Sequence, residues 1–220
     1  KLNSLKVLEL RCNDINKNSY SCLSKITSLK KLTLYMEDES TVDKSKRIDL
    51  SWIKNLKKLE EFTFSLFSLK RNTFACLAEL PKLKRLKTTT FLTNNEFRQI
   101  AKFKNLQEID LFMIVNKYVT DDNIDVIVEH EKLKEIKLDG IAITNKSITK
   151  LCNKKDLETL EIFNNKLLVS LFTDSHIKTL FEQKSLKKLL IVGYKTAITE
   201  NGYKCIGKIN NLRYLCLYGP

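Results

Sequence analysis

Apolar residues recur along the chain in one short pattern, Leu-x-x-Leu-x-Leu, in which Ile, Phe and Thr replace Leu at some places. The pattern returns every 23 to 30 residues. Its second half, in which apolar and other residues alternate, is typical of a short β-strand with one buried face. The nine copies begin at Leu5, Leu29, Leu59, Leu83, Leu106, Leu133, Leu157, Leu186 and Leu212. The chain is therefore interpreted as an array of repeats.

A second apolar pattern precedes the leading Leu of every repeat after the first. Residues nine and six positions upstream are apolar each time, as Phe97 and Ile100 are before Leu106. This spacing places both residues on one face of a helix. Thr93 and Glu96 have the spacing of a capping box at its start. A threonine followed by Asn, Asp or Glu marks the helix start here and again at Thr120, Thr144, Thr173 and Thr199. Each unit is predicted as strand, loop, capped helix and turn.

These units resemble leucine-rich repeats over essentially all 220 residues. The resemblance implies an α/β fold, a curved solenoid of about nine repeats with parallel strands on the concave face and helices on the convex face. A single unit cannot bury its apolar strand edge and helix stripe, so neighbouring units must cover them. We therefore expect residues 1–220 to form one domain, either a segment of a longer protein or an array with bare ends.

The stretch from Leu138 to Leu151 is similar to the cysteine-containing class of these repeats, which occurs in F-box substrate adaptors. That class carries a cysteine three residues before the leading Leu. The equivalent positions here hold Ile26, Leu56, Leu80, Phe103, His130, Lys154, Gln183 and Ile209. No F-box is recognisable in the sequence. The architecture is expected to carry over, whereas the subfamily stays open.

The chain is strongly basic, with 39 Lys and Arg against 26 Asp and Glu and a formal net charge of +13. Such a charge could attract nucleic acid, anionic lipid or an acidic protein. On the expected strand face, however, acidic residues offset most of the basic ones and the repeats alternate in sign, whereas a phosphate track favours a continuous stripe. Surface solvation is the favoured interpretation. A nucleic-acid or anionic-surface binder that uses a lysine-rich helix face is the alternative function.

Signatures of catalysis and of metal or cofactor binding are lacking in the sequence. It has no phosphate-cradling glycine loop, no nucleophile elbow and no zinc-type cysteine spacing. His130 and His176 fall in predicted convex helices. We expect no catalytic residues, no metal and no cofactor, and hence no enzyme, unless a catalytic domain lies outside these residues. Cys22, Cys76 and Cys205 share one helix position and are expected to be small buried thiols. The sequence shows no paired cysteines of the kind that cap the ends of such arrays, which favours a reducing intracellular compartment, the cytoplasm.

Aromatic and methionine side chains on the expected concave face are the candidate binding residues. Exposed side chains of this kind on a rigid surface are costly in water and serve as interface anchors. The other interpretation is that a loop or a further segment covers them. The candidates are Tyr35, Met36, Phe112, Met113, Phe163 and Tyr218. The basic residues Lys84, Arg85 and Lys87, which face acidic neighbouring strands, are expected to add electrostatic steering.

The predicted function is noncatalytic recognition of another macromolecule, most readily a protein, through the concave face. The resemblance suggests two settings for it. One is substrate recognition in a ubiquitin-ligase adaptor, and the other is a pathogen effector that acts on host proteins.

Overall fold

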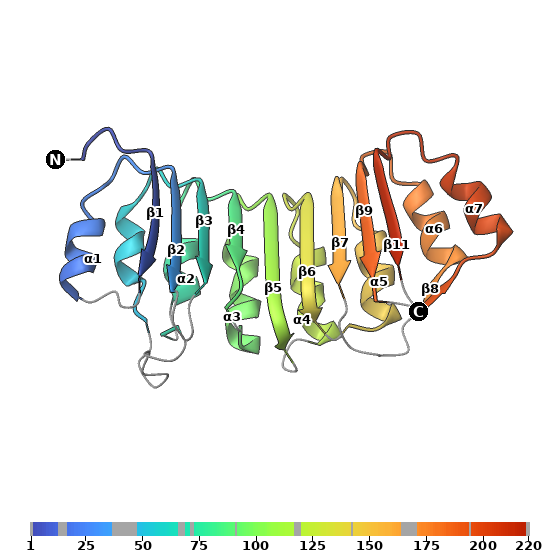
Figure 1. The fold of residues 1–220 in the computed structure, drawn as a ribbon, viewed down its shortest axis with the longest axis horizontal. Coiled ribbons are helices and arrows are strands. Elements are labelled where there is room, and N and C mark those ends of the chain that lie inside the picture. The colour runs from blue at the N-terminus through green and yellow to red at the C-terminus, as the bar shows by residue number, and fades with distance from the viewer. Residues whose placement is uncertain are drawn as a thin grey trace. The chain divides into compact units, whose positions relative to one another are not determined.

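The computed structural model shows a regular alternation of strands and helices (Figure 1). Two compact units, residues 1–109 and 110–220, make up the chain. The structure describes residues 2–12, 17–36, 48–65, 69–70, 73–90, 92–116, 120–141, 143–163, 171–193 and 195–218.

Nine strands form the main sheet, and each contains the alternating part of one repeat. The neighbours are β1, β2, β3 and β4 in order in the first unit, and β5, β6, β7, β9 and β11 in the second. Strands pair in parallel with equivalent repeat positions opposite each other, as for Leu32 and Phe62 or for Leu160 and Leu189. The bounds are β1 Val7–Cys12, β2 Lys31–Met36, β3 Glu61–Ser65, β4 Arg85–Thr88, β5 Glu108–Asn116, β6 Glu135–Ile141, β7 Thr159–Phe163, β9 Lys188–Val192 and β11 Tyr214–Tyr218.

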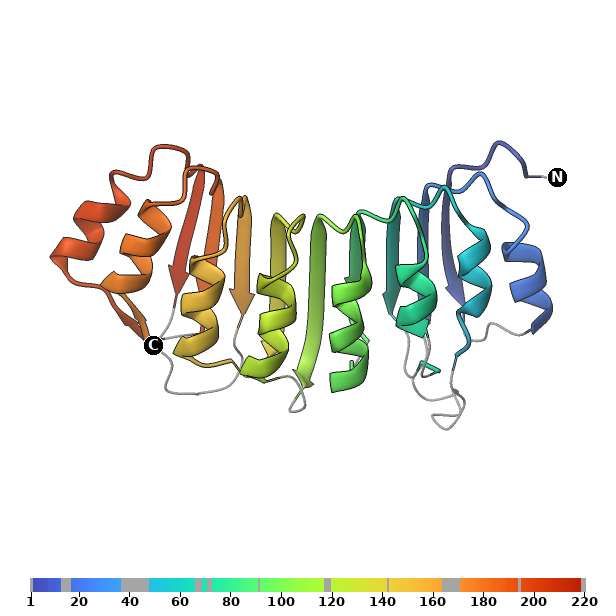
Figure 2. The same ribbon diagram turned by 180° about the vertical axis from the view of Figure 1, so that it is seen from behind.

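The helices of each unit lie on one side of its strands, in front of them in the view of Figure 2. The other side of the sheet, called the open face below, carries no helix within the described residues (Figure 1). The bounds are α1 Lys17–Leu23, the 3-10 helix η1 Ser51–Asn55, α2 Thr73–Ala78, α3 Asn94–Arg98, the 3-10 helix η2 Gln99–Lys102, α4 Asp121–Val128, α5 Asn145–Cys152, α6 Asp174–Phe181 and α7 Glu200–Ile206.

The apolar positions of the repeat build the core between strands and helices. Leu32 of β2 and Phe62 and Phe64 of β3 are fully buried. The rings of Phe62 and Phe64 are stacked with centroids 5.0 Å apart, and Phe74 of α2 meets Phe64 edge-on at 6.3 Å. Phe74 belongs to the predicted helix stripe and is itself fully buried. These contacts confirm the buried faces that the sequence predicts for both the strands and the helices.

The predicted helix starts are also confirmed. Thr93 is the N-cap of α3, its N–H donates to Glu96 Oε2 at 2.7 Å, and the N–H of Glu96 donates to Thr93 Oγ1 at 3.4 Å. In the capping boxes of α4 and α6, Asn123 and His176 replace the glutamate. Each box satisfies backbone donors that a helix start would otherwise leave without a partner. The other N-caps are Thr120, Thr144, Thr173 and Thr199.

An acidic residue after the capping threonine ties one repeat to the next. Asp121, the first residue of α4, accepts hydrogen bonds from the N–H of Thr144 at 2.9 Å, from its hydroxyl at 2.6 Å, and from the Ser147 hydroxyl. Asp174 accepts the N–H of Thr199 at 2.8 Å in the same way. Burial would raise the pKa of Asp121, but these hydrogen bonds hold it below its ordinary value. One carboxylate thus caps the helix of the following repeat.

Two local features depart from the simple repeat. The helix before Leu59 is the 3-10 helix η1 and not an α-helix. Leu50 at its N-cap makes no side-chain capping bond, and Asp49 Oδ1 instead accepts the N–H of Ser51 at 2.8 Å. The short strands β8 (Leu171–Thr173) and β10 (Lys195–Ala197), which the sequence pattern does not reveal, pair in parallel as a second sheet. Among the described helices, none has both the length and the apolar character needed to cross a membrane.

Candidate binding surface on the open face

Tyr35 lies on the open face of β2 in the first unit, where it is partly buried. Strand β1 places Arg11 opposite it, with the guanidinium carbon 5.4 Å from the centre of the Tyr35 ring. This is a cation–π contact. Arg11 also pairs with Glu9 at 3.1 Å. Tyr35 is therefore held by a neighbouring strand, and it belongs to a different unit from Phe112, Phe163 and Tyr218.

The basic residues of β4 pair with acidic residues of the neighbouring strands. Arg85 forms ion pairs with Glu61 and, through Nε at 3.3 Å, with Glu108. Lys87 lies 3.0 Å from the same Glu108, whose carboxylate is buried, while Lys84 is exposed beside them. Arg85 and Lys87 thus neutralise acidic groups of their own sheet. Their charge is consequently less available to steer a partner than the sequence suggests.

Three side chains form an aromatic and apolar line across the second unit, here called the aromatic row: Phe163, Val192 and Tyr218. Phe163 of β7 faces Val192 of β9, and Val192 faces Tyr218 of β11. Phe163 and Val192 are partly buried, and Tyr218 is 71% exposed. With a strand spacing of about 4.8 Å, the two aromatic residues are separated by about 10 Å of sheet. The structure therefore brings together two of the four predicted aromatic anchors.

A second row of side chains, two residues earlier in the same three strands, lies next to the aromatic row. Leu190 of β9 is buried between Glu161 of β7 and Cys216 of β11. Glu161 is also buried and pairs with Lys188 at 3.1 Å and with Lys137 at 3.8 Å. The charges around Leu190 are therefore compensated within the sheet, and the exposed apolar surface is that of the aromatic row.

The remaining candidates of the second unit lie on β5. Phe112 is 48% exposed and occupies the same repeat position as Phe163 and Tyr218. Met113 lies in β5 and Met36 ends β2, but the side chains of both methionines lie outside the described part of the structure. Phe112 is thus an additional exposed aromatic residue of the second unit.

Asp139 of β6 lies directly opposite Phe163. Its side chain is buried, and this burial, together with the nearby charge of Asp110, raises the pKa of the carboxyl, although a hydrogen bond from the Gly140 N–H acts in the opposite direction. A carboxylate in this position costs folding free energy when it ionises. The aromatic row therefore ends beside a carboxyl group whose ionised form is disfavoured in the folded protein.

His176 and Cys152 are buried within the second unit. His176 accepts the N–H of Thr173 at Nδ1 (3.1 Å) and places Nε2 3.1 Å from Thr149 Oγ1, while burial lowers its pKa. Cys152 is fully buried, and burial raises the pKa of its thiol to about 12. Cys22 is exposed and Cys76 and Cys205 are only partly buried, so the expectation of buried thiols at this helix position was wrong. Within the described residues, no group of three His, Cys, Asp or Glu side chains could hold a metal ion.

The sequence matches no protein-family model, and no curated protein is significantly similar to it. The structure, however, is similar to that of an internalin from Listeria monocytogenes, with a TM-score of 0.56 over 99% of this chain at 18% sequence identity. The fold is that of a leucine-rich-repeat protein. The expected α/β repeat solenoid is thereby confirmed. This chain spans 56% of the length of the internalin chain, and the likeness extends to the fold.

Two features of this leucine-rich-repeat fold are missed when the anchors are sought by residue type alone. Val192 is not aromatic, yet it joins Phe163 to Tyr218 across the sheet. Lys187 and Arg213 follow the leading Leu of consecutive repeats, so the sequence puts two cations side by side there. Both Val192 and the adjacent cations become apparent when the repeats are aligned and equivalent positions are compared.

Proposed function

We propose that the chain is a noncatalytic module that binds another protein through the open face of its second unit, with Phe163 and Tyr218 as the anchors. The observation that carries the proposal is the aromatic row, in which Val192 links two aromatic side chains at the surface of a rigid parallel sheet. Tyr218 is 71% exposed. Aromatic residues held on a rigid support are the side chains most enriched among interface hot spots.

The energetics favour apolar recognition over a purely electrostatic contact. Burying a hot-spot tyrosine beneath a partner contributes about 2 kcal/mol or more to binding, which is a factor of about 30 in affinity. Most charges on the open face are paired within the sheet, as Glu161 is with Lys188 and Glu108 is with Lys87. Salt weakens attraction between exposed charges, so an apolar anchor should keep a partner bound at salt concentrations that release a partner held by charge alone.

The setting that we propose rests on the sequence resemblance. The resemblance of Leu138–Leu151 to the repeats of F-box adaptors suggests two settings, recognition of a ubiquitin-ligase substrate or action as a pathogen effector on host proteins. The cysteine pattern favours a reducing compartment, the cytoplasm. We place the module there.

The test is capture of partners from a cell lysate by three forms of the chain. The wild type is compared with the double variant Phe163→Ala, Tyr218→Ala and with Tyr203→Ala. Tyr203 is a matched control because it is 61% exposed but lies in α7, on the helix side. The captures are made at about 0.15 M and about 0.5 M salt, which separates apolar from electrostatic attachment.

We expect at least one protein that is retained at both salt concentrations, lost with the double variant and kept by Tyr203→Ala. A second outcome favours the alternative function, binding of nucleic acid or an anionic surface by the lysine-rich helix face. In that case the ligand would be released at the higher salt concentration and would bind the double variant as well as the wild type.

A further inference from the structure

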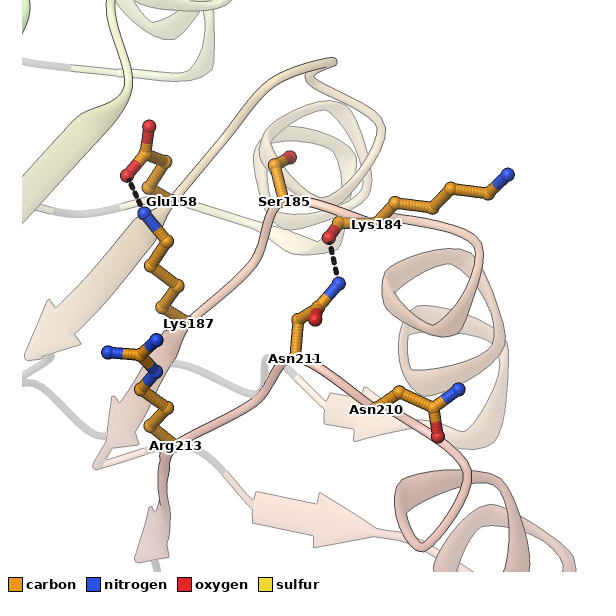
Figure 3. Close-up of a pocket in the computed structure, with 7 residues that line it drawn as sticks. All are labelled: Glu158, Lys184, Ser185, Lys187, Asn210, Asn211 and Arg213. Atoms are coloured by element: carbon orange, nitrogen blue, oxygen red, sulfur yellow. Dashed lines mark hydrogen bonds and ion pairs between the residues drawn. The ribbon is translucent and has the colours of Figure 1, made fainter.

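A polar pocket of about 440 Å3 lies beside the strand starts of the second unit (Figure 3). It is formed where the turns that lead into β9 and β11 pass next to each other. The pocket is lined by Glu158, Lys184, Ser185, Lys187, Asn210, Asn211 and Arg213. Three cations and one acidic residue thus surround a space large enough to hold a small polar group with its solvent.

The backbone places one residue of each repeat in register at this edge of the sheet. The N–H of Lys187 donates to the carbonyl of Glu158 at 2.8 Å, and the N–H of Arg213 donates to the carbonyl of Lys187 at 2.8 Å. Each of these residues follows the leading Leu of its repeat. Their side chains therefore start about 4.8 Å apart, one strand spacing each.

The charges in this line alternate up to Lys187, and then the alternation ends. Glu158 accepts hydrogen bonds from Lys187 and, at 3.2 Å, from Lys134, and these hold the pKa of its carboxyl below the ordinary value. The next position would pair with Lys187 if it were acidic, but it is Arg213. Among the described residues, the Arg213 guanidinium has no carboxylate within ion-pair distance. Of these two adjacent cations only Lys187 has an acidic partner, Glu158, which it shares with Lys134.

Further hydrogen-bond donors line the same pocket. The Ser185 hydroxyl has no hydrogen-bond partner among the described residues, and it projects beside the turn that carries Asn211 (Figure 3). The side-chain amide of Asn211 donates to the carbonyl of Lys184, which ties the two turns together. Arg213 presents a planar set of N–H donors, the arrangement that suits carboxylate and phosphate oxygens.

We propose that this pocket binds one anionic oxygen group, a carboxylate or a phosphate monoester, that the protein partner carries on a side chain. The anion takes the place of the missing acidic residue and completes the alternation beside Lys187 and Arg213. The part of the proposal that concerns the partner rests on the proposed function, whereas the anion site itself does not.

The geometry also specifies the spacing of the recognised segment. Arg213 directly precedes β11, and Tyr218 ends it. Arg213 and Tyr218 are five residues apart, which corresponds to about 17 Å at 3.3 Å per residue. An extended segment that lies along β11 would therefore carry its acidic group about five residues from its apolar anchor.

The test uses the full chain and three probes: inorganic phosphate, acetyl-phosphoserine amide and acetyl-glutamate amide. Binding is followed through the amide chemical shifts of Ser185 and Arg213 at constant ionic strength. Arg213→Gln removes the unpaired cation, and Glu158→Gln releases Lys187 from its acidic partner. Arg98→Gln is the matched control, because Arg98 is an exposed arginine of α3 in the other unit.

We expect at least one of the two amino-acid probes to bind, about tenfold more weakly to Arg213→Gln, more tightly to Glu158→Gln and unchanged to Arg98→Gln. The tighter of the two identifies a phosphorylated or an acidic side chain as the source. Binding of inorganic phosphate alone, no shift with any probe, or equal weakening by Arg213→Gln and Arg98→Gln would overturn the proposal.

The anion site and the proposed function fail separately. If capture of the protein requires Tyr218 but Arg213→Gln leaves the affinity for the probes unchanged, the anion site is wrong and the apolar recognition stands. If Arg213→Gln weakens binding of the probes but no protein requires the aromatic row for its capture, the anion site stands and the protein-binding proposal is wrong.

Discussion

Replacement of Asp121 by alanine should remove a link between two repeats while leaving the core untouched. Asp121 belongs to α4, but its carboxylate accepts the N–H and the hydroxyl of Thr144 and the hydroxyl of Ser147, all in the following repeat. Ser147 is fully buried, so its hydroxyl would lose its partner inside the protein. Stability in a repeat array depends on such interfaces between neighbours.

The magnitude follows from the bonds that are lost. Loss of a helix cap costs about 1 kcal/mol, and a buried hydroxyl left without a partner costs about 1 kcal/mol or more. We therefore expect Asp121→Ala to lower the free energy of unfolding by about 2 kcal/mol. Asp122→Ala is the matched control, since Asp122 is the next residue of the same first helical turn and is exposed. Both substitutions remove the same favourable interaction with the helix dipole.

The assay is urea unfolding followed by circular dichroism at neutral pH. The difference in unfolding free energy between the two variants isolates the bonds to Thr144 and Ser147. The folded pKa of Asp121 is below the ordinary value of 3.8, so its contribution is complete above that pH and is lost as the pH falls through the folded pKa. Equal unfolding midpoints for Asp121→Ala and Asp122→Ala would refute the reasoning.

Two further predictions concern groups whose pKa the fold shifts. His176 has a pKa below its ordinary value of 6.5, so the wild type should lose stability as the pH falls below 6.5, whereas His176→Asn, which keeps an acceptor for the Thr173 N–H, should not. Urea midpoints at about pH 7.5 and about pH 5.5 check this, and parallel losses in both proteins would contradict it. Asp139 has a raised pKa, so Asp139→Asn should be more stable than the wild type at neutral pH, with the gap closing as the pH falls toward 3.8. Thermal unfolding over that range checks this, and a variant that is less stable at neutral pH would contradict it.

The repeat fold could be predicted because its determinants are local in the sequence. The strand alternation of Leu32 and Leu34, and the spacing of Thr93 and Glu96, each lie within a few residues, and the structure confirms both. The 3-10 helix η1 could not be anticipated in this way, because Leu50 holds the apolar stripe position nine residues before Leu59, as Phe97 does before Leu106. Short-range sequence patterns therefore predict most of the elements.

The candidate site was harder to predict because it depends on which side chains of neighbouring repeats lie opposite each other. Arg85 and Lys87 looked available, but parallel register brings Glu61 and Glu108 against them. The burial of Asp139 likewise cannot be derived from its own neighbours in the sequence. Side chains about 25 residues apart decide these contacts, so they appear only when the strands are aligned.

The most direct test of the central claim is oxidative footprinting of tyrosines with and without the captured partner. Tyr218 on the open face is 71% exposed, and Tyr203 on the helix side is 61% exposed, so both should be oxidised readily in the free chain. We expect the partner to protect Tyr218 and to leave Tyr203 reactive. Protection of Tyr203 with Tyr218 still oxidised would show that the partner binds the helix side, and would contradict recognition through the open face.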